Sequence, residues 1–446
     1  MKNFKFIKFA KFSRDCKYCK HCKYYLSLLL TFIFCSQVIA TDLKPPIDLP
    51  SAQVLPKGVR NFRYKGLNVN GNEKFNNQGE QRILADPFFK ELTFRDLLDT
   101  SKEEIDRKDP INDEIDKAML RGYLESNGYN LDDNVGTTTG AVSVAAYGHV
   151  PIFAYGLTDA LTLAVAVPVV KYKFNVATGF AKKNNIQNAT DSLAAEGKTY
   201  QQGEFVKKMS NPISVKLASF GYSPLEAEER TKLGDINLAA KYLVNKSDIW
   251  MFSIQGTLTL PTGSKADINK VIDIPGGDGQ FDIGMTLLNE FSNLVPSTTF
   301  TIAIGNTIQF NDKLEKRIPY RQDSKLTADI DRRTSRDLGD IYFAQTGIKY
   351  APAMGFNFNL GHAFQYKEAD QYSGAVFPAY RYNWLAIETE QRMQTVQVGA
   401  GYSTLELFKN KKFPVPLEFN LNHSMVIAGK NVNKDPLTTV EFVMYF

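Results

Sequence analysis

Apolar residues recur at every second position in stretches of about ten residues along much of the chain. The clearest stretches are 250–260, 300–310, 356–367 and 417–427, where the intervening positions are mostly polar or small. A period of two places the apolar side chains on one face of a β-strand and the others on the opposite face. Strands of this length and pattern are typical of a transmembrane β-barrel, whose outer face meets lipid and whose lumen is polar.

The pattern therefore predicts an all-β fold: a transmembrane antiparallel β-barrel of about twelve strands, with helical extracellular loops. The candidate strands lie near residues 59–70, 139–153, 158–176, 232–245, 248–262, 280–292, 297–311, 337–351, 353–370, 392–406, 415–429 and 436–446. An even number of strands places both ends of the barrel domain, 41–446, on the periplasmic side.

The lengths of the connections alternate as such a barrel requires. Those after the second, fourth, sixth, eighth and tenth strands are short, whereas those after the odd-numbered strands are long, apart from the moderate last one. Short periplasmic turns and long extracellular loops are typical of bacterial barrels. A soluble β-sandwich would also alternate, but here the polar face is predicted to point inward and aromatic residues lie near the strand ends of the other face.

The last seven residues, Val440–Phe446, alternate up to a terminal aromatic residue. This ending resembles the last strand of bacterial outer-membrane barrels, in which such a strand is read by the barrel assembly machinery. The resemblance implies that Phe442, Met444 and Phe446 act as the assembly signal.

Residues 1–40 have the three parts of a signal peptide: a basic region with eight Lys and Arg, a mostly apolar run over 24–33, and a cleavage site after Ala40. A retained membrane anchor is the alternative, although the apolar run is short for a spanning helix. Export with cleavage predicts a protein of the bacterial outer membrane, with its lipids as partners.

Removal of this segment changes the charge and the chemistry of the chain. The sequence has 53 Lys and Arg against 48 Asp and Glu, and cleavage leaves 45 against 47, so charge gives no argument for nucleic acid. All four cysteines precede Ala40, and the Cys16, Cys19 and Cys22 spacing with His21 is a weak metal signal in a segment bound for removal. We expect no metal and no cofactor.

Two connections are longer than simple tethers. The connection 71–138 contains two notable segments, residues 88–98 and 110–124. The second is predicted to be a helix because Asp109 can cap it and Pro110 suits its first position. The loop 177–231 has a polar middle and a more regular stretch at 225–230. Such loops either cap the pore and shape a ligand pocket or only shield the rim.

Projection of the alternation inward predicts a set of polar pore-lining residues. They are Asp235, Asn237, Lys241, Gln255, Asp282, Glu290, Asn357, Asn359, Gln365, Lys367, Glu418, Asn420, Asn422 and Glu441. Both signs of charge occur among many amides, so strong selection by charge is not expected. The same residues would also suit the solvated interior of a plugged barrel, and the sequence leaves the two open.

A lipid-acting hydrolase is the main alternative from another class, because some outer-membrane barrels of this size are phospholipases. Such an enzyme needs a serine within reach of a histidine. Only His149, His362 and His423 follow Ala40, and Ser424, the neighbour of the last, points to the opposite face of its strand. We expect no catalytic residues; an adhesin or structural barrel is the third reading.

Several strings in the second part of the chain occur in a recognisable order: 155–163, 233–236, 258–263 and 277–282, of which the last reads Gly-Asp-Gly-Gln-Phe-Asp. Together they resemble the outer-membrane family labelled putative MetA-pathway of phenol degradation, whose members look like transporters related to the long-chain fatty acid transport barrels. The resemblance covers about residues 135–446 and implies passive uptake of small hydrophobic or aromatic molecules. A small-molecule ligand is thus the expected partner.

Overall fold

The computed structural model describes residues 43–94, 121–195, 212–322 and 326–446 of the 446-residue chain. The signal peptide, its Ala40 site, its cysteines and most of the helix predicted over 110–124 lie outside the described residues. The end of that predicted helix is helical at 121–126. Among the residues described, no helix is long and apolar enough to cross a membrane.

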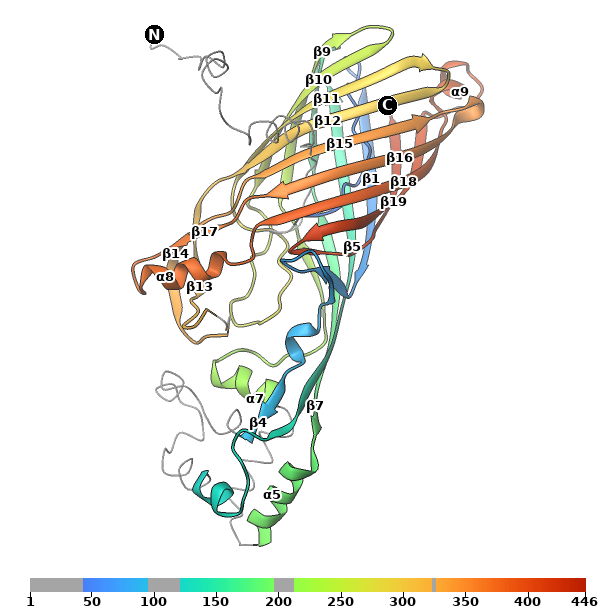
Figure 1. Cartoon of the computed structure of the whole chain (residues 1–446). Coiled ribbons are helices and arrows are strands. Elements are labelled where there is room, and N and C mark those ends of the chain that lie inside the picture. The colour runs from blue at the N-terminus through green and yellow to red at the C-terminus, as the bar shows by residue number, and fades with distance from the viewer. Residues whose placement is uncertain (1–42, 95–120, 196–211, 323–325) are drawn as a thin grey trace, which may run out of the picture.

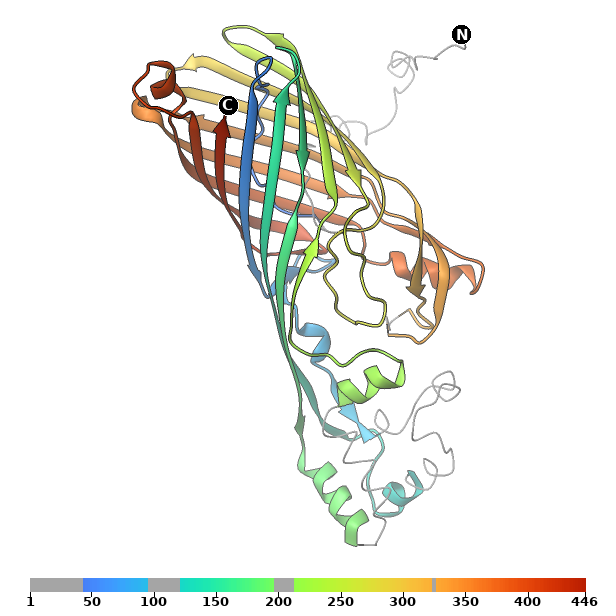
Figure 2. The ribbon, with the colours of Figure 1, turned by 180° about the vertical axis from the view of Figure 1, so that it is seen from behind.

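A closed, twelve-stranded antiparallel β-barrel forms the body of the molecule (Figures 1 and 2). Its elements are β1 (Arg60–Gly71), β5 (Asn134–Gly156), β6 (Leu161–Ala166), β7 (Val169–Lys182), β8 (Glu228–Leu233), β9 (Ile236–Lys246), β10 (Trp250–Leu260), β11 (Asp282–Val295), β12 (Thr298–Gln309), β15 (Ile341–Tyr350), β16 (Phe356–Lys367), β18 (Gln391–Ser403), β19 (Leu417–Lys430) and β21 (Leu437–Tyr445). The predicted fold class is confirmed.

Two of the twelve strands are interrupted side by side. β6 and β7 follow one another around Pro168, and β8 and β9 around Gly234 and Asp235. Pro168 has no backbone N–H for the ladder, and its carbonyl accepts a hydrogen bond from the Gly234 backbone N–H at 2.8 Å. A Cβ at Gly234 would lie 2.8 Å from the Pro168 ring, so glycine permits this close approach.

The barrel closes through its first and last strands. β21 pairs antiparallel with β1 from Tyr445 opposite Asn61 to Leu437 opposite Val69, and β1 pairs with β5 on its other side. The backbones of Arg60 and Phe446 exchange hydrogen bonds of 2.8 and 3.0 Å. The chain end is therefore a paired barrel strand, as its alternation predicted.

The two ends of the barrel differ as the connection lengths predicted. One end, here called the turn end, carries the short connections, the start of β1 and the end of β21; one of these connections contains η2 (Ala353–Gly355) and another α9 (Leu405–Lys409). The opposite end, here called the loop end, carries the long connections. β5 and β7 continue there as a ribbon well beyond the other strands (Figure 1).

The loop-end connections contain short elements of their own. They are β2 (Glu73–Phe75), β3 (Gln81–Ile83), η1 (Asp86–Phe88), β4 (Glu91–Thr93), α5 (Asn184–Ala195), α7 (Pro212–Ser219), β13 (Asp312–Arg317), β14 (Ile330–Asp337), β17 (Gln371–Ser373), α8 (Ala379–Asn383), η3 (Trp384–Ala386) and β20 (Val432–Asn433). The loop predicted over 177–231 is shorter than expected because β7 runs on to Lys182 and β8 begins at Glu228.

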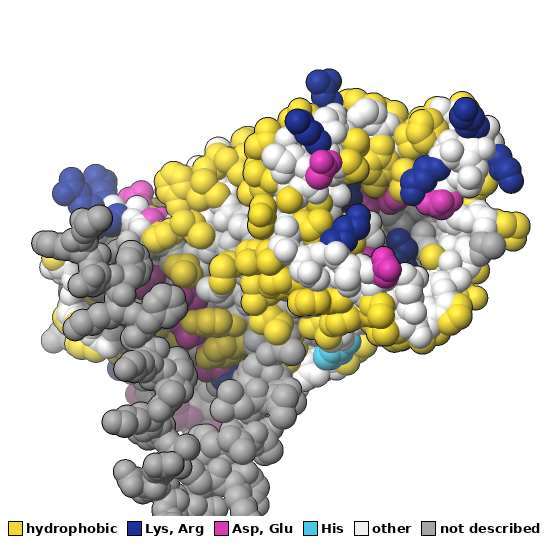
Figure 3. All heavy atoms as spheres, turned by 90° about the horizontal axis from the view of Figure 1, so that it is seen from above, with side chains coloured by type: hydrophobic (Ala, Val, Ile, Leu, Met, Phe, Trp, Pro, Cys, Tyr) yellow, Lys and Arg dark blue, Asp and Glu magenta, His cyan; other side chains and the backbone are white. Residues whose placement is uncertain are grey.

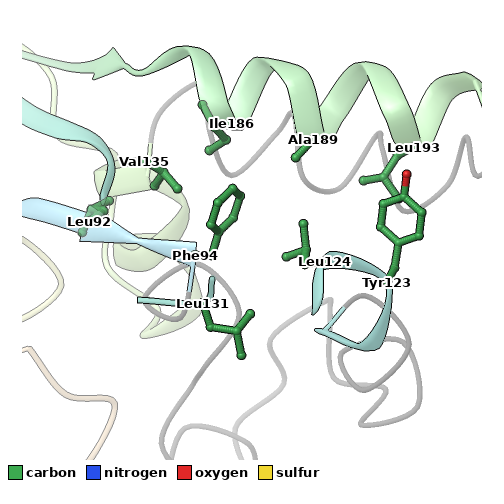
Figure 4. Packing of buried hydrophobic residues seen from close by; sticks show 9 residues of the cluster. All are labelled: Leu92, Phe94, Tyr123, Leu124, Leu131, Val135, Ile186, Ala189 and Leu193. Carbon is green, nitrogen blue, oxygen red and sulfur yellow. The ribbon is translucent and has the colours of Figure 1, made fainter. Parts of the chain in front are cut away.

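A separate apolar core lies at the far tip of the β5–β7 ribbon. Its buried residues come from the two long loops and from the ribbon (Figure 4): Leu92, Phe94, Tyr123, Leu124, Leu131, Val135, Ile186, Ala189 and Leu193. Phe94 and Leu124 are fully buried, and α5 covers them with one face. The two long loops therefore pack against each other as one small unit, which their separate sequences did not predict.

The barrel wall presents apolar side chains outward and mostly polar ones inward. On β16, Phe356, Phe358 and Leu360 are 49%, 52% and 51% exposed, whereas the intervening Asn357 is 5% exposed. Trp250 and Phe252 stack on the outer face near the turn end, with ring centroids 6.0 Å apart. An outward apolar wall with aromatic residues near its edge is the surface that a barrel needs in a lipid bilayer.

Candidate functional site

The N-terminal residues 43–56, here called the strap, pass through the inside of the barrel before β1 begins. Leu43 is buried near the loop end against Met393 and Val426, and its backbone N–H donates to Gln391 Oε1 at 2.9 Å. Near the turn end, Leu55 N donates to Thr162 Oγ1 at 2.7 Å. The strap therefore crosses the lumen along most of its length.

Amide and hydroxyl side chains of one wall hold the first part of the strap. They donate to successive strap carbonyls: Gln365 Nε2 to Lys44 O (2.6 Å), Ser424 Oγ to Pro46 O (2.9 Å), Gln397 Nε2 to Ile47 O (2.9 Å) and Gln345 Nε2 to Asp48 O (2.6 Å). The part of the strap over residues 43–50 contains Pro45, Pro46 and Pro50, which have no N–H to donate. A wall of donors therefore matches a segment that offers chiefly acceptors.

The middle of the strap is clamped at three neighbouring strands, β9, β10 and β11. Glu290 accepts hydrogen bonds from Ser51 Oγ (3.1 Å), Ala52 N (3.1 Å) and Gln53 Nε2 (2.8 Å). Lys241 Nζ donates to Ser51 O at 2.9 Å, and Ser253 Oγ donates to the Ala52 carbonyl. Ala52 and Ser253 are fully buried, so the contact between them is closed to solvent.

A group of charges joins the strap to the seam between β1 and β21. The Asp48 carboxylate of the strap pairs with Lys65, which also lies 3.4 Å from the carboxylate of Glu441. Arg63 approaches Glu441 at 3.2 Å. Lys65 and Glu441 are each 5% exposed, and buried charges of this kind are stable only while they are paired.

Two glycines make room for the strap. A Cβ on Gly361 would lie 2.5 Å, and one on Gly347 2.7 Å, from the side chain of Leu49. The two glycines lie opposite each other on β16 and β15. This notch in the wall is an inward-facing feature that no polar pattern predicts.

A cavity of 1440 Å³ remains between the strap and the barrel wall. Most of the predicted pore-lining residues border it: Asn237, Lys241, Gln255, Glu290, Asn357, Asn359, Glu418, Asn420, Asn422 and Glu441. Figure 3 shows the molecule from above, with a hollow at the turn end that has Lys and Arg as well as Asp and Glu side chains on its rim and walls. The strap occupies the lumen without filling it.

Four of the predicted residues lie elsewhere in the interior. Gln365 is fully buried against the strap, and Lys367 forms a buried ion pair with Asp370. Asp235 accepts hydrogen bonds from the backbone N–H groups of Gly263 and Asp278, and Asp282 is buried opposite Gln309. These side chains organise the loop end of the barrel.

The carboxyl groups of Asp235 and Asp278 have raised pKa values because they are partly shielded from water. Burial raises the pKa of Asp235 above its usual value, against the opposing effect of the hydrogen bonds that it accepts. Burial also raises the pKa of Asp278, and the nearby Asp235 carboxyl adds to that shift. Deprotonation therefore costs more in the folded loop than in an unfolded one.

One side of the cavity is apolar. Val150, Ile152, Ala154, Ala164, Ala166 and Ala239, here called the apolar patch, line it on β5, β6 and β9. Strand pairing places Ala154 beside Ala164 and Ala164 beside Ala239. The small alanine side chains leave space next to the wall. Alternation alone did not predict this patch, because inward positions were expected to be polar.

Several cations that border the cavity were also missed: Arg63, Lys65, Lys246, Lys349 and Lys409. They lie on β1, at strand ends or in a turn. Alternation of apolar residues is weak at these places, so no pattern assigned them to the lumen.

The histidines form no hydrolase site with the groups that they touch. His149 contacts the hydroxyl of Tyr64, and His423 Nδ1 lies 2.9 Å from Thr438 Oγ1. His362 is exposed on the strand position that faces outward. In the described part of the chain, no group of three or more His, Cys, Asp or Glu is placed to hold a metal ion.

No protein-family model matches this sequence, and no curated protein matches it. Solved structures do show likeness. The COG4313 outer membrane channel from Pseudomonas putida F1 has a TM-score of 0.47 at 12% identity, with 90% of this chain and 100% of that chain covered. The Pseudomonas putida toluene transporter TodX gives 0.31 and 12%, with 88% and 89% covered.

A Pseudomonas aeruginosa FadL homologue has a TM-score of 0.31 at 7% identity, with 87% of this chain and 90% of that chain covered. Likenesses of this size carry no argument about function. The resemblance to the MetA-pathway family stays a prediction, and the function is argued below from the lumen.

Proposed function

We propose that this protein is an outer-membrane channel for the passive uptake of small hydrophobic or aromatic molecules. The observation that supports this best is the cavity of 1440 Å³ inside a closed barrel, bordered on one side by the apolar patch. A space of this size accepts small organic molecules. The alanines of the patch give such a molecule an apolar surface along the barrel wall.

The outer surface supports a place in the bilayer. A closed barrel has no unpaired strand edge in the hydrocarbon region, and its exposed apolar side chains would be covered by lipid. If the short connections lie on the periplasmic side, as in bacterial barrels, the turn end faces the periplasm and the loop end faces the outside. The small core at the tip of the ribbon then stands away from the membrane on the outer side.

The strap is the barrier that a transported molecule has to pass. Hydrogen bonds to β16 and β11 hold the strap across the direct path through the lumen. The strap therefore has to shift, or the ligand has to pass beside it. Neither route requires energy from a nucleotide. A plugged barrel that never opens, such as an adhesin, is the competing reading.

Swelling of proteoliposomes tests the proposal. Liposomes that hold the refolded protein should swell faster than empty ones in an isotonic solution of arbutin, a soluble aromatic glycoside that crosses a lipid bilayer only slowly. The control is a variant that narrows the cavity beside the apolar patch, Ala164→Phe, which should slow the swelling. Equal swelling rates with and without folded protein would contradict transport.

A further inference from the structure

The walls of the cavity bring three cations to the edge of the apolar patch. Strand pairing places Arg63 beside Ile152 and Lys65 beside Val150. On the other side of the patch, Lys241 follows Ala239 at the next inward position of β9 and pairs with Thr162. An apolar surface with positive charge at its border fits a molecule that has an apolar body and an anionic group.

The charges around this patch balance only while the strap is in place. Glu441 and Glu290 supply two negative charges against Arg63, Lys65 and Lys241, and the strap's Asp48 supplies the third. If the strap leaves, Lys65 loses a carboxylate partner and Lys241 loses the Ser51 carbonyl. Lys65 then shares Glu441 with Arg63, and the three cations face only two carboxylates, so an open lumen favours another anion at this place.

The remaining charges at the cavity are mostly positive. Lys246 and Lys349 also border it, towards the turn end, and Lys409 lies there with its partner Glu406. The Glu418 carboxylate, by contrast, is hydrogen-bonded to Tyr445. Six cations then line the cavity against the three carboxylates Glu290, Glu418 and Glu441, so the field in the lumen is positive once the strap has moved.

On the basis of the proposed transport function, we propose that the ligands are small apolar carboxylates, and that the ligand carboxylate replaces Asp48 on Lys65. The apolar body lies against the apolar patch, while the carboxylate accepts hydrogen bonds from Lys65 and the adjacent cations. Binding of the ligand and release of the strap are then the same event, because both compete for one partner. Neutral aromatic molecules of equal shape have no carboxylate and cannot displace Asp48 from Lys65 in this way.

Benzoate and benzamide, which differ in charge but hardly in shape, test the proposal. The readout is the rate at which a maleimide labels a single cysteine, Ala52→Cys, in the buried middle of the strap. Benzoate should raise the labelling rate about tenfold more than benzamide does, as expected for the loss of one charge-assisted contact. Lys65→Gln should remove this difference, whereas Lys65→Arg, which keeps the charge, should restore it.

Two further variants keep the test decisive if Lys65→Gln does not fold. Asp48→Asn changes only the strap; it should raise the labelling rate without ligand and shrink the additional effect of benzoate. Lys349→Gln removes another cation from the same cavity and should leave the difference between benzoate and benzamide intact. If benzoate and benzamide raise the labelling rate of Ala52→Cys equally in the protein with no lumen substitution, the carboxylate proposal is overturned.

The outcome is separable from the proposed transport function. If proteoliposomes swell in arbutin but benzoate and benzamide release the strap equally, the channel stands and the carboxylate proposal fails. If liposomes that hold folded protein do not swell in any of these solutes, transport itself fails.

Discussion

Replacement of Glu290 by Gln should release the strap. The carboxylate accepts three hydrogen bonds from strap residues, at 2.8 to 3.1 Å. A glutamine keeps one acceptor oxygen but presents an NH₂ group to donors that the second oxygen had satisfied. Hydrogen bonds to charged groups contribute about 1.5–3 kcal/mol each, so Glu290→Gln should weaken strap binding by about 2–4 kcal/mol.

A loss of this size changes the fraction of molecules with a released strap by about 30- to 700-fold, because each 1.4 kcal/mol is a factor of ten. The cysteine Ala52→Cys measures it, since the four natural cysteines all precede Ala40 and a protein that begins at Thr41 has no other. When opening and closing are fast, the labelling rate follows the released fraction. The rate in Glu290→Gln should therefore rise by this factor.

Glu418→Gln is the matched control. Glu418 lines the same cavity, but its carboxylate is hydrogen-bonded to Tyr445, so the same chemical change should leave strap labelling within about twofold of the parent. An unchanged labelling rate in folded Glu290→Gln would show that the clamp does not hold the strap. A rise of equal size in both variants would assign the effect to the lumen as a whole.

Three further outcomes follow from the structure. Gly361→Val should push Leu49 out of its notch and raise strap labelling, whereas Gly256→Val, where a Cβ meets nothing within 4 Å, should not. Burial raises the pKa of Asp235 and Asp278, so the loop that they hold should lose stability as the pH rises through their folded pKa values. The loop should be most stable below the ordinary carboxyl range. An acid-tolerant protease should therefore cut the loop faster at pH 7 than at pH 4, after the intrinsic cleavage rates are corrected on a peptide. Asp273→Asn breaks a nearly buried ion pair with Lys232 and should destabilise the same loop by about 3 kcal/mol, again read by proteolysis.

The barrel could be predicted from the sequence because its wall obeys one simple rule. Apolar residues face outward at every second position, and connection lengths alternate between the two ends, so strand number and orientation followed without tertiary information. The same rule gave the inward position of Lys241 and Glu290. Their partners could not be predicted, because they lie on an extended segment that has no periodicity of its own.

The strap and the apolar patch escaped the sequence analysis for a related reason. Residues 43–56 are rich in proline and show no period of two. Only the arrangement of Gln345, Gln365 and Gln397 on neighbouring strands reveals that a chain lies against them. The alanines of the patch are too small to mark a face by hydropathy. Both features depend on contacts between residues that are far apart in the sequence.

The interruption at Pro168 and the core of the distal tip show the same limit. Pro168 lies within the strand predicted over 158–176, and its consequence for the neighbouring strand at Gly234 appears only once the two are paired. The buried residues of the tip are contributed by two loops that sequence analysis could treat only one at a time.

Single-channel conductance tests the central claim most directly, namely that this barrel is a channel whose lumen is closed by the strap. Two refolded proteins should be compared in planar bilayers, one that begins at Thr41 and one that begins at Pro56 and so lacks most of the strap. We expect rare or small conductance steps from the first and large, frequent steps from the second. Silence from both, with the barrel shown to be folded, would contradict a channel; equal conductance would contradict closure by the strap.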